Sequence, residues 1–135
     1  MAYENWISVH ITNHTRDKIV KVQNAEVSWG KFYKTGDKDH EISAANVNET
    51  TVAIGGSADV SSCGRQDSPS GATGSIELWD NENKICKIVW DCPWGSQPNK
   101  FAVVDPHEDY WVQYDGWNRD GAGIGTVNVG IGFHG

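Results

Sequence analysis

The sequence predicts an all-β fold, an antiparallel β-sandwich in which residues 1–135 form a single domain. Three observations predict it. Apolar and polar residues alternate with a period of two in several short segments, which is typical of half-buried strands. Turn residues separate these segments at intervals of about ten residues, the spacing of a sandwich or barrel. The length matches one domain, and no linker or internal repeat divides the chain.

Seven segments carry the strand pattern: residues 6–12, 20–23, 26–29, 76–79, 84–90, 110–115 and 127–133. In the first of them Ile7, Val9 and Ile11 alternate with their neighbours, whereas residues 84–90 are apolar on both faces. Alternation that leaves one face for solvent favours antiparallel pairing. Glycine, proline and small polar residues predict turns at residues 35–39, 55–57, 64–74, 81–83 and 121–125.

The charge balance excludes some classes of partner. The chain has 11 lysines and arginines against 18 aspartates and glutamates, a net charge of −7. This argues against nucleic acid and against a polybasic anchor on anionic lipid, because both need a basic surface. The first residues lack the basic and apolar regions of a signal peptide. We therefore expect the protein to be cytoplasmic in the producing cell or to leave it by an unconventional route.

Cysteines and catalytic motifs offer little chemistry. Cys63, Cys86 and Cys92 can form at most one disulfide, and we interpret them as buried thiols, with pairing of the last two left open. Their spacing fits no zinc-ligand pair. The chain has no phosphate-binding loop, no nucleophile elbow and no histidine pair at metal-ligand spacing. We therefore expect no enzyme, no cofactor and no metal site, and rank a metal-dependent hydrolase as a minor alternative.

Seven tryptophans are more than the core of a small sandwich needs. Exposed tryptophan is typical of membrane interfaces, sugar-binding clefts and cages for quaternary ammonium groups. The segment 90–96, Trp-Asp-Cys-Pro-Trp-Gly-Ser, predicts one such residue: Pro93 ends a strand, so Trp94 should project from the following loop. Asp91, next to these indoles, suits an ammonium or choline group. Its alternative is a turn carboxylate that binds its own backbone.

Two other loops carry candidate phosphate ligands. Residues 28–39 contain Trp29 and a locally basic stretch in which Lys31 could hold a phosphate as a point charge. The alternative is a solvated strand end. Residues 61–74 form a long, hydroxyl-rich segment in which the Arg65 guanidinium could make a bidentate contact to phosphate. The alternative is an ion pair between Arg65 and Asp67 or another carboxylate.

Several short motifs together resemble one known family, the aegerolysins. They are Ala2-Tyr3 with Trp6, Ser28-Trp29-Gly30-Lys31, Gly36-Asp37-Lys38-Asp39, Cys63-Gly64-Arg65, Gly71-Ala72-Thr73-Gly74 and the segment 90–96. They occur in the family's order and cover nearly the whole chain, and the seven-residue segment is very specific.

The resemblance implies a β-sandwich that recognises sphingolipid head groups, such as sphingomyelin with cholesterol or ceramide phosphoethanolamine. It implies a haemolytic or insecticidal toxin component, which acts at the target cell membrane with a larger partner of the membrane-attack-complex/perforin type. The family's loop aromatics match three tryptophans here, and its motifs retain two basic residues and one acidic residue. The predicted lipid-binding residues are Trp6, Trp29, Lys31, Arg65, Asp91 and Trp94.

A carbohydrate-binding module or lectin is the alternative function. Sandwiches with exposed tryptophan stack on sugar faces, and the side chains of Asp91, Asn99 and Asp115 could bind hydroxyl groups. Competition by free sugars would favour this alternative, and binding to sphingolipid vesicles would favour the first.

Overall fold

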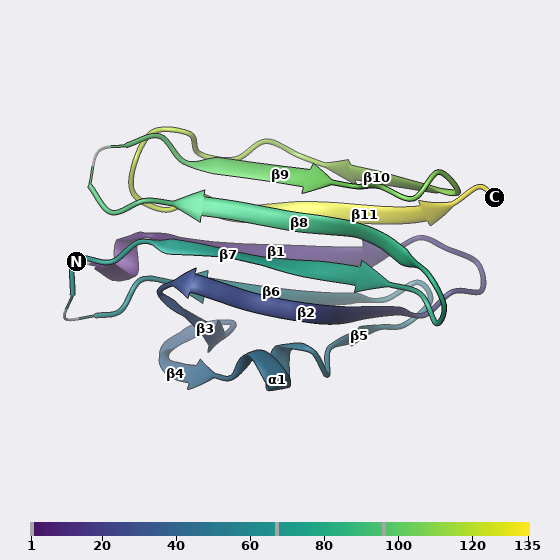
Figure 1. Ribbon diagram of the computed structural model, residues 1–135, viewed down its shortest axis with the longest axis horizontal. Coiled ribbons are helices and arrows are strands. Elements are labelled where there is room, and N and C mark those ends of the chain that lie inside the picture. Colours follow the sequence, from purple (N-terminus) through teal and green to yellow (C-terminus); the bar gives the residue numbers. More distant parts are fainter. Residues whose placement is uncertain (1, 67, 96) are drawn as a thin grey trace.

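Two β-sheets pack face to face in the computed structural model, which describes residues 2–66, 68–95 and 97–135 (Figure 1). The six-stranded sheet contains, in spatial order, β10 (Tyr110–Tyr114), β11 (Gly125–Phe133), β1 (Trp6–Asn13), β6 (Ser57–Cys63), β3 (Lys31–Lys34) and β4 (Asp37–Ile42). The five-stranded sheet contains β5 (Thr51–Val52), β2 (Val20–Trp29), β7 (Ala72–Trp79), β8 (Lys84–Cys92) and β9 (Lys100–Val104). A short 3-10 helix (Ala2–Glu4) and one helical turn, α1 (Ala44–Val47), complete the described elements. The predicted β-sandwich is confirmed.

The core lies between the sheets and follows the alternation of the strands. Ile7, Val9 and Ile11 of β1 are fully buried, as are Leu78 of β7 and Ile88 of β8 from the facing sheet. Burying such side chains contributes about 1.5–3 kcal/mol each, so the period-two pattern fixes which face of each strand turns inward.

One pairing departs from the antiparallel prediction. β1 and β11 run parallel, with Val9 opposite Val127, whereas the other pairings between described strands are antiparallel. β11 begins at the same end of the sandwich as β1 (Figure 1), so the two strands must share a direction. Alternation reports which face is buried and favours antiparallel pairing in general, but it does not fix the direction of an individual strand.

Some element boundaries also differ from the prediction. The segments 20–23 and 26–29 form one strand, β2, with a bulge between Gln23 and Glu26. The turns predicted at 35–39, 55–57 and 64–74 are shorter than expected, because residues 37–39, Ser57 and residues 72–74 belong to strands. β4 and β6 were not predicted from the sequence, because they are rich in charged or hydroxyl side chains and show little apolar alternation.

The two ends of the sandwich differ, and each is named here by its loops. The aromatic end contains the loops 64–71, 93–99 and 115–124; in Figure 1 it is the left end, which carries the N-terminus. The far end contains the loops 14–19, 53–56, 80–83 and 105–109 and carries the C-terminus. In the described part of the chain, no helix is long and apolar enough to cross a membrane.

The three cysteines, all in the described ranges, are free and buried, so Cys86 and Cys92 form no disulfide. Burial raises the pKa of the Cys86 thiol to about 12 and that of Cys92 to about 11. Both thiols are therefore protonated at neutral pH, which agrees with their interpretation as packing residues.

Candidate functional site at the aromatic end

Strand register places Trp6 and Lys31 in one row of the six-stranded sheet. Both residues lie opposite Cys63, Trp6 on β1 and Lys31 on β3. Arg65 follows Cys63 by two residues, so it leaves the same row from the end of β6. Three predicted site residues from distant parts of the chain therefore meet at the aromatic end.

The other three predicted residues belong to the five-stranded sheet. Trp29 on β2 and Asp91 on β8 both lie opposite Thr73 on β7. Asp91 is half-buried and accepts a hydrogen bond of 2.9 Å from the Thr73 hydroxyl. It therefore binds a neighbouring strand, and the predicted alternative of a bond to its own backbone is not the observed contact. Trp94 extends this region through the loop that follows β8.

A single glycine joins the two rows. Gly30 carries the chain from β2 in one sheet to β3 in the other, with a φ of +89°. A Cβ atom there would collide with the carbonyl oxygen of Cys63 and lie 2.7 Å from that of Gly71. Only glycine satisfies both the positive φ and this close approach, so Gly30 fixes Trp29 beside Lys31.

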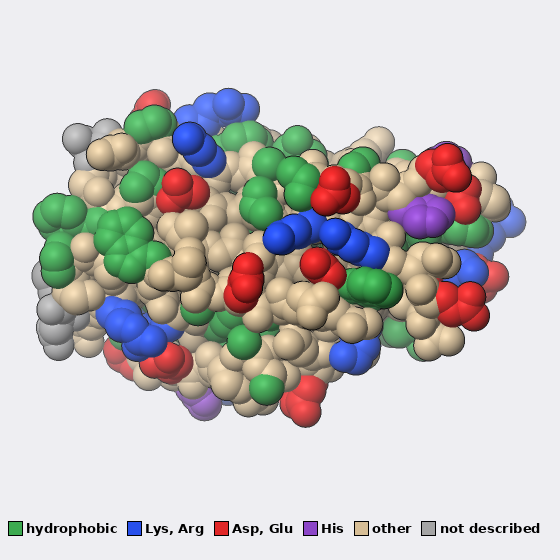
Figure 2. Space-filling model, viewed as in Figure 1, with side chains coloured by type: hydrophobic (Ala, Val, Ile, Leu, Met, Phe, Trp, Pro, Cys, Tyr) green, Lys and Arg blue, Asp and Glu red, His purple; other side chains and the backbone are tan. Residues whose placement is uncertain are grey.

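Trp29 and Trp94 expose large apolar surfaces at this end. Their exposed fractions are 43% and 49%, among the highest of the large hydrophobic residues. Figure 2 shows hydrophobic side chains gathered at the left end of the molecule. The exposure of Trp94 after Pro93 agrees with the sequence prediction.

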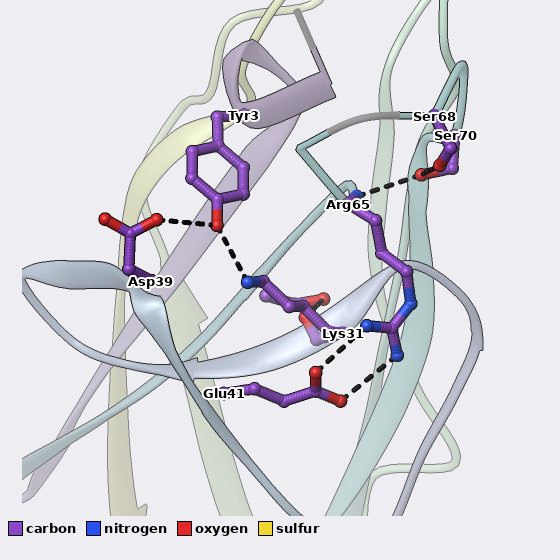
Figure 3. A network of polar contacts seen from close by, with 8 residues as sticks. Tyr3, Lys31, Asp39, Glu41, Arg65, Ser68 and Ser70 are labelled. Atoms are coloured by element: carbon purple, nitrogen blue, oxygen red, sulfur yellow. Dashed lines mark hydrogen bonds and ion pairs between the residues drawn. The ribbon is translucent and has the colours of Figure 1, made fainter.

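Lys31 is neither solvated nor open to a ligand. Its side chain is buried, and its ammonium Nζ donates a hydrogen bond of 2.9 Å to the Tyr3 hydroxyl (Figure 3). The same Nζ lies 4.8 Å from the centre of the Tyr3 ring, and the Tyr3 hydroxyl donates to Asp39 at 3.0 Å. Lys31 therefore positions Tyr3 and supplies positive charge from below the surface.

Arg65 pairs with a carboxylate, as its alternative interpretation proposed. The two terminal guanidinium nitrogens, Nη1 and Nη2, donate to the two carboxylate oxygens of Glu41 on β4, at 2.9 and 3.1 Å (Figure 3). The hydrogen bonds from Arg65 lower the pKa of Glu41. Both side chains are about half exposed, and an exposed ion pair contributes only about 0–1 kcal/mol. The other candidate partner, Asp67, lies outside the described residues.

A recess opens beside Trp6 on the outer face of the six-stranded sheet, with a volume of about 570 Å³. Its walls are the aromatic side chains of Tyr3, Trp6 and Tyr33, and its rim carries Lys38 and Asp39. The Nζ atom of Lys38 lies 4.9 Å from the centre of the Trp6 ring and donates to the Tyr3 carbonyl at 2.9 Å. We call it the Trp6 recess.

Sequence reasoning assigned no role to the tyrosines or to Asp39 of the Trp6 recess, and it treated Lys38 only as one lysine of a locally basic stretch. Tyr3, Lys38 and Asp39 do occur in the motifs that carry the family resemblance, and that signal would have identified them. Tyr33 gave no signal, because the hairpin of β3 and β4 that brings it to the recess was not predicted.

The loop 115–124 supports Trp6 from the side. The buried side chain of Asn99 donates hydrogen bonds to the carbonyl oxygens of Asn118 and Gly121, at 3.0 and 3.1 Å. A Cβ atom at Gly123 would collide with the Trp6 indole. Asn99, a candidate sugar ligand in the lectin alternative, therefore serves to hold this loop.

Comparison with known proteins agrees with this geometry. The model of the family described as Aegerolysin matches residues 4–134. Asp-hemolysin of Aspergillus fumigatus is 47% identical over 131 residues, covering 97% of this chain and 94% of that protein. Ostreolysin A6 of Pleurotus ostreatus is 36% identical over 132 residues, covering 96% and 95%. The crystal structure of RahU protein in complex with a TRIS molecule has a TM-score of 0.94 at 34% identity, covering 99% and 98%. The chain therefore belongs to the aegerolysin family, as its motifs indicated.

Proposed function

We propose that this protein recognises sphingolipid head groups at a membrane surface and that it recruits a larger perforin-type protein to form pores. Aegerolysins are non-enzymatic proteins that bind lipids. The observation that carries the finer proposal is the aromatic end, where two exposed tryptophans occur at the same end of the sandwich as a recess with aromatic walls and a charged rim.

The exposed indoles of Trp29 and Trp94 would enter the head-group layer. A tryptophan buries about 150–250 Å² when fully covered. In the folded chain about half of the surface of each of these two residues is already buried against the protein. Covering the remaining half, about 100 Å² each, contributes roughly 2 kcal/mol per residue. Each tryptophan should thus change membrane affinity about thirtyfold.

The Trp6 recess suits a zwitterionic head group. The ammonium would lie against the Trp6 indole, near Asp39, on the ring face that the Lys38 ammonium now contacts. Lys38, once displaced, would meet the phosphate together with Arg65, whose exposed pair with Glu41 is weak. Such a head group needs local charge complementarity, which is compatible with a net charge of −7.

The two remaining predicted residues take different parts in this proposal. Lys31, beneath Tyr3, adds buried positive charge to the phosphate side of the recess. Asp91 lies on the other sheet, separated from Trp29 by Thr73 of the intervening strand β7. There its carboxylate would meet the ammonium group of a neighbouring lipid.

Co-sedimentation with vesicles of four compositions tests lipid recognition. They are phosphatidylcholine alone, phosphatidylcholine with cholesterol, sphingomyelin with cholesterol, and ceramide phosphoethanolamine with phosphatidylcholine. We expect binding to one or both of the sphingolipid mixtures only. Equal binding to phosphatidylcholine, or no binding to any mixture, would contradict the proposal.

A pair of tryptophan variants tests which end binds. Trp94→Ala should weaken vesicle binding about thirtyfold with little loss of stability. Trp79→Ala is the matched control, because Trp79 ends β7 at the far end. Unchanged sedimentation of Trp94→Ala, or an equal loss for Trp79→Ala, would remove the aromatic end from the proposal.

Dye release tests the need for a partner. The purified chain, bound to sphingolipid vesicles at low concentration, should release no entrapped dye. Efficient release by this chain alone would show that the perforin-type partner is unnecessary.

A further inference from the structure

A second recess lies on the outer face of the six-stranded sheet, where β10, β11 and β1 run side by side. Gly130 of β11 lies at its centre, opposite Gln113 of β10 on one side and Thr12 of β1 on the other. Because Gly130 has no side chain, its backbone forms part of the floor of the recess, next to the rings of His14 and Trp111. The recess has a volume of about 360 Å³, and we call it the Gly130 recess.

An aromatic wall closes one end of the Gly130 recess. The indole of Trp111 lies so close over Gly132 that a Cβ atom there would collide with it. The His14 ring stacks on Trp111 with centroids 5.8 Å apart and planes inclined by 24°. Trp111 remains partly exposed, so part of a flat apolar surface faces the recess.

Hydrogen-bonding groups form the opposite end. The carboxylate of Asp115 accepts hydrogen bonds from the backbone N–H and side-chain Nδ2 of Asn128, at 2.9 and 2.7 Å. These bonds lower the pKa of Asp115, and each carboxylate oxygen keeps a further acceptor site. The exposed amide of Gln113 and the hydroxyl of Thr12 line the two sides.

We propose that the Gly130 recess binds a neutral hexopyranose, the terminal sugar of a glycan. The apolar C–H face of such a ring would lie against Trp111, while its hydroxyls would donate to Asp115 and exchange hydrogen bonds with Gln113. The recess spans two strand spacings, about 9.5 Å, which is enough for one pyranose ring with its hydroxyl groups.

Other ligand classes fit this recess less well. No lysine or arginine is among the described residues that line it, and the Asp115 carboxylate would repel a phosphate or an acidic sugar. A metal ion would find a single carboxylate that already accepts two hydrogen bonds. A quaternary ammonium group needs several aromatic walls, and the ring of Tyr114 is turned against Phe101 and Trp117 instead.

The sugar site is separate from the proposed lipid site. Thr12, opposite Gly130 at the centre of the recess, follows Trp6 by six residues along β1, which corresponds to about 20 Å. The Asp115 end of the recess lies nearer, at the start of the loop 115–124. A molecule held by its aromatic end would carry the Gly130 recess above the head-group layer, where the glycans of glycolipids and glycoproteins stand. The sugar test below uses no membrane, so it can succeed or fail independently of the sphingolipid proposal.

Titration of the ¹⁵N-labelled protein with methyl glycosides of galactose, glucose and mannose tests the proposal by NMR, with glycerol as a control polyol. We expect at least one glycoside to cause saturable shifts of the Trp111 indole N–H and the Asn128 side-chain amide. The Trp94 indole should not shift. Shifts that glycerol reproduces, shifts confined to Trp94, or no saturable shift at tens of millimolar would each overturn the proposal.

Gly130→Thr is the decisive variant, because it fills the floor. A Cβ atom at Gly130 would lie 3.2 Å from His14 Cδ2 and 3.6 Å from Trp111 Cζ3, so it meets side chains that can yield. Affinity should fall at least about tenfold, which is about 1.4 kcal/mol. Asp115→Ala should act in the same direction without filling the floor. Lys87→Thr, on the other sheet, is the matched control and should bind normally; an equal loss there would contradict a specific site.

Two further arms identify the source of the sugar. Wild-type protein and Gly130→Thr are compared on vesicles that contain a neutral glycosphingolipid and on an immobilised glycoprotein with the same terminal sugar. Binding that depends on Gly130 in either arm supports the site and names its source. Binding that is the same for both proteins in both arms would contradict it.

Discussion

The far end and the aromatic end of the sandwich differ in how their buried polar groups are hydrogen-bonded and in the apolar side chains that they expose. At the far end Asn13, fully buried, donates hydrogen bonds to the carbonyls of Lys18 and Val52 and accepts two from Thr15. At the aromatic end, by contrast, Trp29 and Trp94 leave large apolar surfaces in solvent. The far end also exposes the aliphatic side chains of Ile19 and Ile54, so the two ends differ in the kind of apolar surface that they present, aliphatic at the far end and indole at the aromatic end.

Buried polar atoms that lack a hydrogen-bond partner also distinguish the two ends. Among the described residues, the buried side-chain nitrogen and oxygen atoms without a hydrogen-bond partner belong to Trp90, Asn99 and Trp117. All three lie at the aromatic end, where β8 finishes, β9 begins and the loop 115–124 packs. Each such atom costs about 1–3 kcal/mol, so these atoms lower the stability of the proposed binding end.

The largest predicted effect on stability is at Asn13. Asn13→Ala removes four hydrogen bonds, three of them buried, and should lower the free energy of unfolding by about 3 kcal/mol, measured by urea denaturation. Arg16→Ala, an exposed neighbour in the same loop, should change it by less than about 0.5 kcal/mol. The folded fraction of Asn13→Ala should bind vesicles as wild type does. Weaker binding would contradict the proposal that the far end takes no part in membrane binding.

A smaller effect is expected at Tyr110, whose hydroxyl donates to the Asp80 carboxylate at 2.5 Å. Burial by itself raises the pKa of Asp80, but this bond and those from the backbone N–H groups of Asn83 and Glu82 lower it overall. The resulting stability is present above the unfolded-state pKa of Asp80 and is lost as pH falls through the lower folded-state value.

Tyr110→Phe should therefore lower the free energy of unfolding by about 2 kcal/mol at pH 7 and flatten its decline in acid. Denaturation curves measured from pH 7 down to pH 2 check both effects. An acid decline as steep as that of wild type would show that Tyr110 does not hold the Asp80 charge.

The sequence predicted the fold and the exposed residues of the aromatic end better than their contacts. Alternation identified β1, β7, β8, β10 and β11, because each places apolar side chains on one or both faces of a strand. Pro93 correctly predicted the exposure of Trp94. These inferences succeeded because they depend on neighbours within one segment.

What failed depends on pairs that are distant in the chain. Glu41 was not foreseen as the partner of Arg65, because β4 carries no apolar pattern that predicts a strand. Lys31 was predicted to hold a phosphate, with a solvated strand end as the alternative. Neither prediction included Tyr3, which the N-terminal 3-10 helix places over the Lys31 ammonium. The parallel direction of β11 likewise follows from the path of the loop before it.

The smallest predicted effect concerns strain at the aromatic end. Ala122 adopts a φ of +52° in the loop that supports Trp6, and its carbonyl accepts a hydrogen bond of 3.0 Å from the Cys92 thiol. A left-handed conformation costs alanine about 1–2 kcal/mol, whereas glycine accepts it but adds about 0.4–1 kcal/mol of unfolded-state entropy.

Ala122→Gly should therefore raise the free energy of unfolding by about 0.5 kcal/mol, the difference between these two effects. Ala45→Gly is the matched control: Ala45 is exposed within α1, and the same replacement there should destabilise by about 0.5–1 kcal/mol. Opposite signs in urea denaturation would locate stored strain at the aromatic end. If both variants are destabilised alike, Ala122 carries no strain, and the stability cost at that end rests on its unpartnered polar atoms alone.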